Sequence, residues 1–153
     1  MKKEILSNVK DGEVFSVAGI EFIKFFDEDG KTVAVAKNSL GDYRFGRNNN
    51  FAESKIKEML EKEVLPKIEA EIGVENIVEH EVDLLSLDGS DKWGKVNCKI
   101  SLPTFDFYRK HVKIFDKHKL NDWWWRPRRS SVFNFCIFYL CILRGIRICR
   151  KLI

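Results

Sequence analysis

Residues 14–26 read Val14-Phe15-Ser16-Val17-Ala18-Gly19-Ile20-Glu21-Phe22-Ile23-Lys24-Phe25-Phe26, two strand-like segments around a short turn at Ala18-Gly19. Apolar and polar residues alternate imperfectly on both sides of that turn, which is typical of a β-hairpin. A second tight turn follows at Asp27-Glu28-Asp29-Gly30, and residues 32–36 return as another strand. The acidic turn lacks the alternating oxygen ligands and distal glutamate of an EF-hand, so we expect a solvated turn and no calcium site. The sequence therefore predicts that the fold begins with consecutive antiparallel strands.

A helix is predicted after these strands, beginning at Asn50. Asn50 is a preferred N-cap residue, and Glu53 stands where a capping-box partner is expected. Apolar residues then follow helical spacing, with charged residues between them on a solvated face: Ile56, Met59, Leu60, Val64, Ile68 and Ile72. Pro66 should end or kink the helix and begin a second piece, and Gly73 should stop that piece.

The next part of the chain predicts two more extended segments and a short helix. The first extended segment is expected from Ile77 to Leu87, followed by a turn at Asp88-Gly89-Ser90-Asp91. Residues 95–102 alternate cleanly between polar and apolar, which predicts a strand with one solvated face. Pro103-Thr104 should open a helix from Phe105 to about His111.

The length of 153 residues fits one domain with a buried core. The positive charges at the N-terminus are not followed by an apolar stretch of signal-peptide length, so a cytosolic origin is expected. The cysteines contain no CxxC pair, and we interpret them as small buried hydrophobic residues: Cys98, Cys136, Cys141 and Cys149. The histidines fall in different predicted elements, and no serine or cysteine is placed by motif to work with them: His80, His111 and His118. We therefore expect no catalytic residue, no metal site and no cofactor.

Charge divides the chain near Trp125. Residues 1–108 hold 15 Lys and Arg against 21 Asp and Glu, net −6, whereas residues 109–153 hold 12 against 2, net +10. The last 28 residues, 126–153, contain no acidic residue. An asymmetry of this size indicates a functional tail or a boundary that is not structural in origin. We therefore predict an α+β domain over residues 1–125 and a basic hydrophobic tail over residues 126–153.

Several motifs stand in a defined order along the first part of the chain: Asn49-Asn50-Phe51-Ala52-Glu53-Ser54-Lys55-Ile56, Val82-Asp83-Leu84, Asp88-Gly89 to Gly94-Lys95-Val96, Leu102-Pro103-Thr104 to Tyr108-Arg109-Lys110, and Asp122-Trp123-Trp124-Trp125. In order and approximate spacing they resemble an uncharacterised family of gut bacteria and their prophages, over about residues 8–125. That family in turn resembles the C-type-lectin-like fold shared by the formylglycine-generating enzymes and phage receptor-binding proteins. The resemblance implies an α+β fold with a small twisted antiparallel sheet, two main helices and a loop-rich ligand face. No activity is established for the family, so the resemblance implies a fold more than a function.

The chain departs from that family after Trp125. The family's tryptophan run is typically followed by Ala-Thr-Pro, a stretch rich in Gly, Ser, Tyr and Asp, and an Arg-Gly-Val-Arg-Pro-like strand. Here Arg126-Pro127-Arg128-Arg129-Ser130-Ser131 follows instead. If the arginine codons are of the CGN type, a reading frame that starts at the third base of the Arg126 codon gives triplets that can encode Ala-Thr-Pro. In the existing frame, by contrast, Arg144-Gly145-Ile146-Arg147 resembles the family's last strand. We hypothesise that residues 126–153 are a frameshifted or otherwise degenerate tail, which the gene's nucleotide sequence would test.

The hydrophobic run from Val132 to Leu143 leaves several interpretations open. It is 12 residues long and contains Asn134, against the roughly 20 apolar residues of a spanning helix. The alternatives are interfacial contact with an anionic bilayer, a core strand, or an aggregation-prone segment that leaves an unpaired sheet edge and a poorly soluble protein. The tail's arginines are the candidate contacts with an anionic surface: Arg126, Arg128, Arg129, Arg144, Arg147 and Arg150. They fit no nucleic-acid-binding motif, so we expect no specific nucleic acid.

The tryptophan run supplies the candidate ligand-binding residues Trp123, Trp124 and Trp125. Three consecutive side chains cannot all share one face of a strand or helix, so at least one must be held by a neighbouring layer or by a ligand. An exposed indole can stack on a sugar ring or anchor a protein partner. In the alternative interpretation, Trp123 and Trp125 belong to the core and Trp124 lies beneath the family's final strands.

We expect a non-catalytic recognition domain or a phage-associated accessory protein, with an unknown protein or glycan as its ligand. The altered tail would remove the ligand face that this segment normally builds. The alternative is a small basic-tailed protein that associates with an anionic membrane surface or an acidic polymer. An oxidoreductase like the formylglycine-generating enzymes would need a cysteine pattern that this chain does not match. The expected location is cytoplasmic, or the phage particle if the gene is prophage-encoded.

Overall fold

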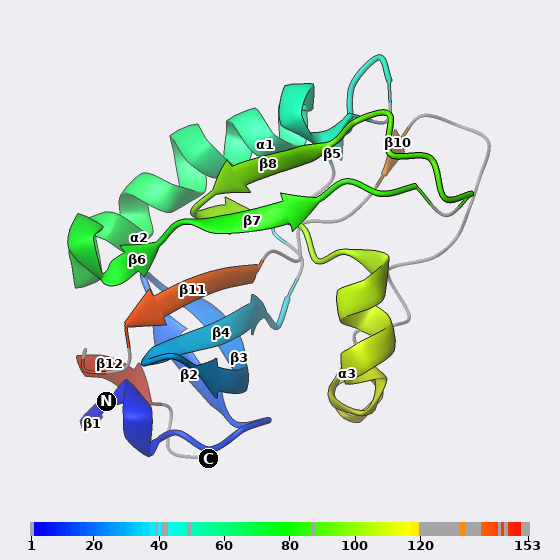
Figure 1. Ribbon diagram of the computed structural model, residues 1–153. Helices are drawn as coiled ribbons and strands as arrows, with labels where there is room; N and C mark the ends of the chain where they lie inside the picture. Colours follow the sequence, from blue (N-terminus) through cyan, green and yellow to red (C-terminus); the bar gives the residue numbers. More distant parts are fainter. Residues whose placement is uncertain are drawn as a thin grey trace.

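The computed structural model shows a mixed α+β fold with antiparallel sheets (Figure 1). The structure describes residues 2–38, 40, 43–48, 50–86, 88–119, 132–133, 139–143, 145 and 147–150. The strands are β1 (Lys2–Ile5), β2 (Val14–Val17), β3 (Ile20–Glu28), β4 (Lys31–Ala36), β5 (Tyr43–Arg44), β6 (Ile77–Val78), β7 (His80–Asp83), β8 (Lys95–Cys98), β9 (Ile100–Ser101), β10 (Val132–Phe133), β11 (Tyr139–Leu143) and β12 (Arg147–Arg150). The helices are α1 (Lys55–Met59), a π-helical turn η3 (Leu60–Val64), α2 (Leu65–Ile72) and α3 (Phe105–Lys117). Short 3-10 turns are η1 (Leu6–Asn8), η2 (Phe51–Glu53) and η4 (Val74–Asn76).

The main sheet has the order β1-β12-β2-β3-β4-β11-β6, and β9 also pairs with β11. Two further pairs, β7 with β8 and β5 with β10, form two-stranded ribbons. Tight turns join β2 to β3 at Ala18-Gly19 and β3 to β4 at Asp29-Gly30. All four turn residues have φ between 48° and 75°, the conformation that two-residue hairpin turns require. The predicted start of the fold is therefore confirmed.

The helical run from Lys55 to Ile72 begins at a different cap from the one predicted. The Ser54 Oγ accepts a hydrogen bond from the Lys57 N–H at 3.0 Å and caps α1. The Asn50 side chain accepts instead from the Ala52 N–H at 3.1 Å and opens η2. The predicted cap at Asn50 is wrong for the helix, because the chain inserts a 3-10 turn before it.

Pro66 lies in the first turn of α2, directly after the π-helical residues Leu60–Val64. A proline lacks the backbone N–H, so Pro66 cannot donate a hydrogen bond to the preceding turn, and the regular α-helical pattern is interrupted just before it. The predicted second helical piece is confirmed, although the chain stays helical across the junction. Gly73 follows α2 with φ 90°, a backbone conformation that favours glycine, and ends the run as predicted.

The helix α3 is longer than predicted, reaching Lys117 instead of about His111. The Thr104 hydroxyl accepts a hydrogen bond from the Phe107 N–H at 3.2 Å and caps its start. His111 departs from helical geometry, with φ −120° and ψ 20°, and the helix continues beyond it. The continuation buries Phe115 completely against the sheet, a tertiary contact that local spacing does not reveal.

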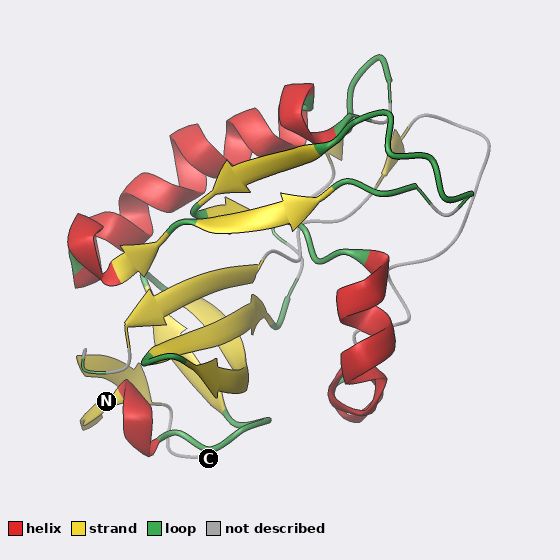
Figure 2. Ribbon diagram, viewed as in Figure 1, coloured by secondary structure: helices red, strands yellow, loops and turns green. Residues whose placement is uncertain are grey.

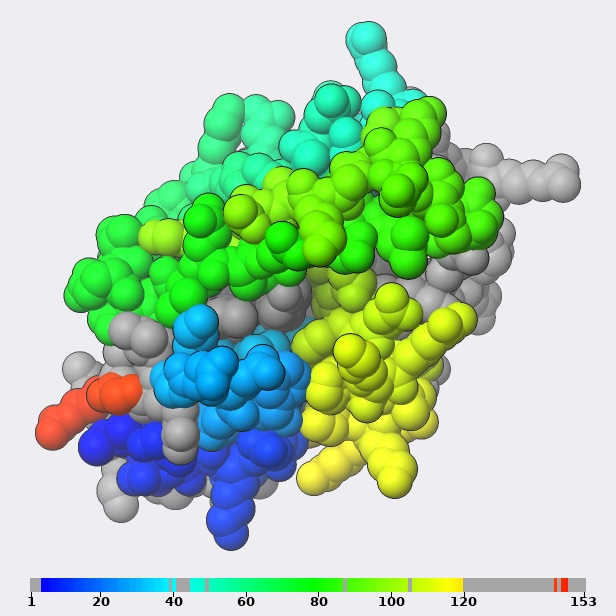
Figure 3. Space-filling view, viewed as in Figure 1, coloured from blue at the N-terminus to red at the C-terminus, as the bar shows by residue number. Residues whose placement is uncertain are grey.

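Two apolar clusters cover the two faces of the central strands. The larger cluster joins the run α1–α2 to the sheet, and its fully buried members include Phe15, Phe22, Ile56 and Leu60. The smaller cluster joins β3 and β4 to α3 through Ile23, Phe25, Val35 and Phe115. Consecutive strand residues point to opposite faces, which is why neighbours in sequence join different clusters. Figure 2 shows the two helical parts on different sides of the strands, and in Figure 3 α3 lies directly against residues of β3 and β4.

The main sheet contains strands that precede Trp125 in the sequence and strands that follow it. β11 lies between β4 and β6, and β12 lies between β1 and β2. Ile148 of β12 is only 1% exposed and belongs to the larger cluster. For Tyr139–Leu143, this pairing favours the core-strand interpretation over a segment without a partner. The frameshift hypothesis concerns the gene and stays a prediction.

Candidate functional site

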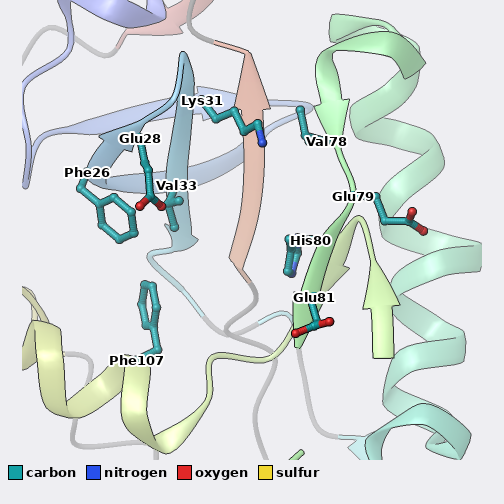
Figure 4. Close-up of a pocket in the computed structure, with 9 residues that line it drawn as sticks. All are labelled: Phe26, Glu28, Lys31, Val33, Val78, Glu79, His80, Glu81 and Phe107. Atoms are coloured by element: carbon teal, nitrogen blue, oxygen red, sulfur yellow. The ribbon is translucent and has the colours of Figure 1, made fainter. Parts of the chain in front are cut away.

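A pocket of about 390 Å³ lies between the main sheet, the β7 strand and α3 (Figure 4). Apolar and charged side chains line it together: Phe26, Glu28, Lys31, Val33, Val78, Glu79, His80, Glu81 and Phe107. These residues come from three parts of the chain that are distant in sequence, namely β3–β4, β6–β7 and α3. The phenylalanines and valines are buried or half-buried, whereas the three glutamates are exposed. The pocket therefore has apolar walls and a charged opening.

The pocket forms where two strands leave the main sheet to pair with each other. Ile77 and Val78 of β6 pair with β11, and after Glu79 the chain continues as β7, which pairs with β8. β8 continues into β9, which returns to β11 at Ile100 and Ser101. The sequence predicts one extended segment in each place, and the structure divides each into two strands. The reason is that β6 and β9 occupy successive residues along the same strand, β11.

A β-bulge builds the aromatic wall of the pocket. The register of β3 against β4 shifts between Lys24 and Phe26, which leaves Phe25 as the extra residue. As a result both phenylalanines face α3, with ring centroids 5.3 Å (Phe25) and 6.4 Å (Phe26) from that of Phe107. The His111 ring stacks on Phe26 at 5.0 Å and 15°. Phe26 and Phe107 thus line the pocket with their positions fixed by packed neighbours.

Glu28 and Lys31 lie at the β3–β4 side of the pocket and are cross-strand neighbours. In Figure 4 the Glu28 carboxylate lies on the same side of β3 as the Phe26 ring, and Lys31 lies at the end far from Phe107. Neither forms an ion pair with another residue in the described part of the chain. The charge of Glu28 is therefore available to a ligand.

Glu79 and Glu81 come from the β6–β7 side of the pocket. In Figure 4 the Glu79 carboxylate turns away from the phenylalanines. Glu81 forms an exposed ion pair with Lys95 of the neighbouring strand at 2.8 Å, which partly offsets its charge. Of the lining carboxylates, Glu28 is thus the one both turned toward the aromatic wall and without an ion pair.

His80 lies where β7 leaves the sheet, with its Nε2 3.0 Å from the Ser101 Oγ. Burial lowers the pKa of His80 from 6.5 to about 4, against the opposing effect of a hydrogen bond with the Val78 backbone. Ser101 is fully buried, so its hydroxyl cannot reach a substrate despite the short distance to an imidazole. Sequence motifs do not reveal this pair, because its members are 21 residues apart and meet only in the fold.

Lowering the pH from 7 to 5 is expected to destabilise the protein by about 2 kcal/mol through His80. The unfolded histidine binds a proton below its ordinary pKa of 6.5, whereas the folded one resists protonation until about pH 4, so stability falls through this window. The variant His80→Gln should lack this contribution. Urea unfolding of both proteins at both pH values measures the difference. Equal pH dependence in the two proteins would contradict a neutral, buried His80.

Cys98 is buried on β8, and burial raises the pKa of its thiol to about 11. Because the thiolate is the reactive form, we expect iodoacetamide to label Cys98 at pH 8 at least about 100-fold more slowly than a free thiol. Labelling in urea should remove this protection. Peptide mass spectrometry after timed labelling distinguishes Cys98 from the other cysteines. Rapid labelling in the native protein would favour the thiol-dependent enzyme that the sequence argues against.

Most of the sequence-predicted site residues lie outside the described residues: Trp123, Trp124, Trp125, Arg126, Arg128, Arg129 and Arg144. Arg147 and Arg150 begin and end β12, where they pair with Ile5 and Lys2 of β1, and Arg147 is exposed. Arg147 does not line the pocket. The pocket residues themselves were missed by sequence analysis. The one local signal is the pair Phe25-Phe26, which interrupts the alternation of β3.

The remaining histidines serve packing in the described structure. His118 Nε2 lies 2.9 Å from the Gly12 carbonyl oxygen and ties the end of α3 to the loop before β2. Among the described residues, no group of three or more His, Cys, Asp or Glu is placed to hold a metal ion. Nor does that part of the chain contain a helix long and apolar enough to cross a membrane.

Comparison with known proteins returned no matching family model, no matching curated protein and no matching solved structure. The resemblance to the prophage family and to the C-type-lectin-like fold therefore rests on the motifs alone.

Proposed function

We propose that the protein is a non-catalytic recognition domain of the C-type-lectin-like kind, serving a phage-associated role, whose ligand binds in the pocket beside α3. The main support is the pocket's composition, with apolar walls and a charged opening built from three parts of the chain. Small-ligand sites typically have volumes of about 300–1,000 Å³, a range that includes this pocket.

The groups around the pocket favour binding over catalysis. The lowered pKa of His80, about 4, makes it a weak base at neutral pH. Ser101 is fully buried, and the raised pKa of Cys98 keeps its thiol protonated. None of these three residues therefore supplies an activated nucleophile.

The test is a binding screen of the full-length protein against arrays of glycans and peptides. A ligand found with the natural chain should bind about tenfold more weakly to Phe107→Leu, because the aromatic wall is altered. The control Leu85→Ala trims an apolar side chain that is 50% exposed and does not line the pocket, and it should bind normally. If the ligand bound Phe107→Leu as tightly as the natural chain, its binding site would lie elsewhere, and the tryptophan run would be the next candidate.

A second proposed function is association with an anionic membrane surface or acidic polymer, favoured by the net charge of +10 over residues 109–153. Arg147 is exposed and available for such contact. Binding to anionic lipid vesicles that weakens with added salt and with Arg147→Gln would support this function. Equal binding of the protein to anionic and to neutral lipid vesicles would contradict this function.

A further inference from the structure

The aromatic wall of the pocket presents a surface that attracts cations. Phe26 and Phe107 both line the cavity, with ring centroids 6.4 Å apart and ring planes inclined at 35°. The face of an aromatic ring carries negative electrostatic potential, so a cation within about 6 Å of the ring centroid is stabilised. Both rings are supported by His111, whose centroid lies 4.6 Å from that of Phe107 and 5.0 Å from that of Phe26.

The charges around this wall favour the same kind of ligand. Glu28 follows Phe26 by two residues on the same strand and forms no ion pair within the described part of the chain. His80 lies across the pocket and is uncharged at neutral pH, because burial lowers its pKa to about 4. Lys31 is the one amine among the lining residues that the structure describes, and it lies at the end far from Phe107.

We infer that this pocket binds an organic cation, an alkylammonium group packed against Phe26 and Phe107 with Glu28 as its counter-ion. The inference rests on the proposed function, since it requires that the pocket be a ligand site. A quaternary alkylammonium group such as that of choline fits better than a metal ion, because it combines apolar surface with weakly hydrated charge and needs no set of oxygen or nitrogen ligands. A neutral alkyl group of the same size would gain the packing without the charge attraction.

Isothermal titration calorimetry of the full-length protein with choline and with its neutral isostere 3,3-dimethylbutan-1-ol isolates the charge. The two molecules share their shape and their hydroxyl group and differ in the charge on the central atom. We expect choline to bind about tenfold more tightly than the alcohol. Equal binding of the two would overturn the inference, and so would the absence of choline binding up to about 10 mM.

Three variants locate the site. Glu28→Gln and Phe107→Leu should each weaken choline binding about three- to tenfold. Glu63→Gln, an equal charge change at an exposed position of the helical run, should leave it unchanged. Circular dichroism of each variant confirms that the fold is retained. Choline binding that persists in Phe107→Leu and Glu28→Gln would also overturn the inference.

The failure of this inference is distinguishable from failure of the proposed function. If glycans or peptides bind and respond to Phe107→Leu while choline does not bind, recognition at the pocket stands and the cationic ligand is wrong. If Phe107→Leu weakens the binding of no glycan, no peptide and not choline, the pocket is not the recognition site and both proposals are wrong.

Discussion

Deleting residues 139–153 is expected to abolish cooperative unfolding and leave an aggregating chain. The deletion removes β11, which pairs with β4 on one side and with β6 and β9 on the other, and β12, which pairs with β1 and β2. Five strands would lose a partner, and the buried residues Val33, Ala34 and Val35 of β4 would stand at an open edge. A loss of this size exceeds the roughly 5–15 kcal/mol that stabilises a typical domain. Urea unfolding followed by circular dichroism, with size-exclusion chromatography, measures the result.

Three further variants separate strand pairing from the length of the chain. Deleting only residues 151–153, which follow β12, should preserve the unfolding transition. Leu140→Pro removes one backbone donor from β11 and should act like the large deletion, because a proline cannot sit in a strand paired on both sides. Leu140→Val keeps that donor and should remain folded. A monodisperse, cooperatively unfolding chain without residues 139–153 would show that residues 1–138 fold without β11 and β12, and would contradict this prediction.

Replacing Lys24 with alanine is expected to cost about 3–5 kcal/mol of unfolding free energy. Lys24 is 1% exposed, and its Nζ donates to the Val9 carbonyl oxygen at 2.8 Å and pairs with the Asp27 carboxylate at 2.6 Å. The other Asp27 oxygen accepts a hydrogen bond from the Thr32 hydroxyl. Removing the amine leaves the Val9 carbonyl and the Asp27 carboxylate without this donor at a site with little access to water. Urea denaturation at pH 7 measures the change.

The matched control for this prediction is Lys62→Ala. Lys62 pairs with Glu58 at the same 2.6 Å, but both side chains are exposed, at 72% and 56%. Solvent screens that pair, so its loss should be barely measurable. The variant Lys24→Met should recover part of the loss, since it restores the apolar stem of the side chain. If Lys24→Ala is as mild as Lys62→Ala, the buried pair contributes no more than a surface pair.

Local chemistry was sufficient for the elements whose signals lie within a few residues. The predicted turn at Ala18-Gly19 is found in the structure, whereas the predicted turn Asp27-Glu28-Asp29-Gly30 is shortened to Asp29-Gly30 because β3 continues to Glu28. The junction before Pro66 and the end of α2 at Gly73 follow from a missing backbone donor and from a positive φ. The helix cap failed at Asn50 because Ser54, four residues later, offers an equivalent oxygen, and local preference does not choose between them.

The candidate site could not be predicted in the same way. The pocket depends on the bulge at Phe25, for which the Phe25-Phe26 pair is the one local signal. It also depends on the departure of the chain from β11 at Glu79, which has no local sequence signature. The pair His80 and Ser101 requires two strands to meet at one edge. The predicted ligand residues Trp123–Trp125 lie outside the described residues, so their role stays a prediction.

The order of turns, helices and polar faces along the first 118 residues is a matter of short-range chemistry, since capping, φ preferences and apolar spacing act over one or two turns of chain. The insertion of β12 between β1 and β2, and of β11 between β4 and β6, is decided by long-range pairing. The residues of a strand do not identify the strand with which it pairs. Backbone hydrogen bonds are the same for every neighbouring strand, and the surface that pairing buries exists only after the sheet has assembled. For that reason the change in net charge near Trp125 can be read from the sequence. That strands on both sides of Trp125 belong to one sheet is known only from the tertiary structure.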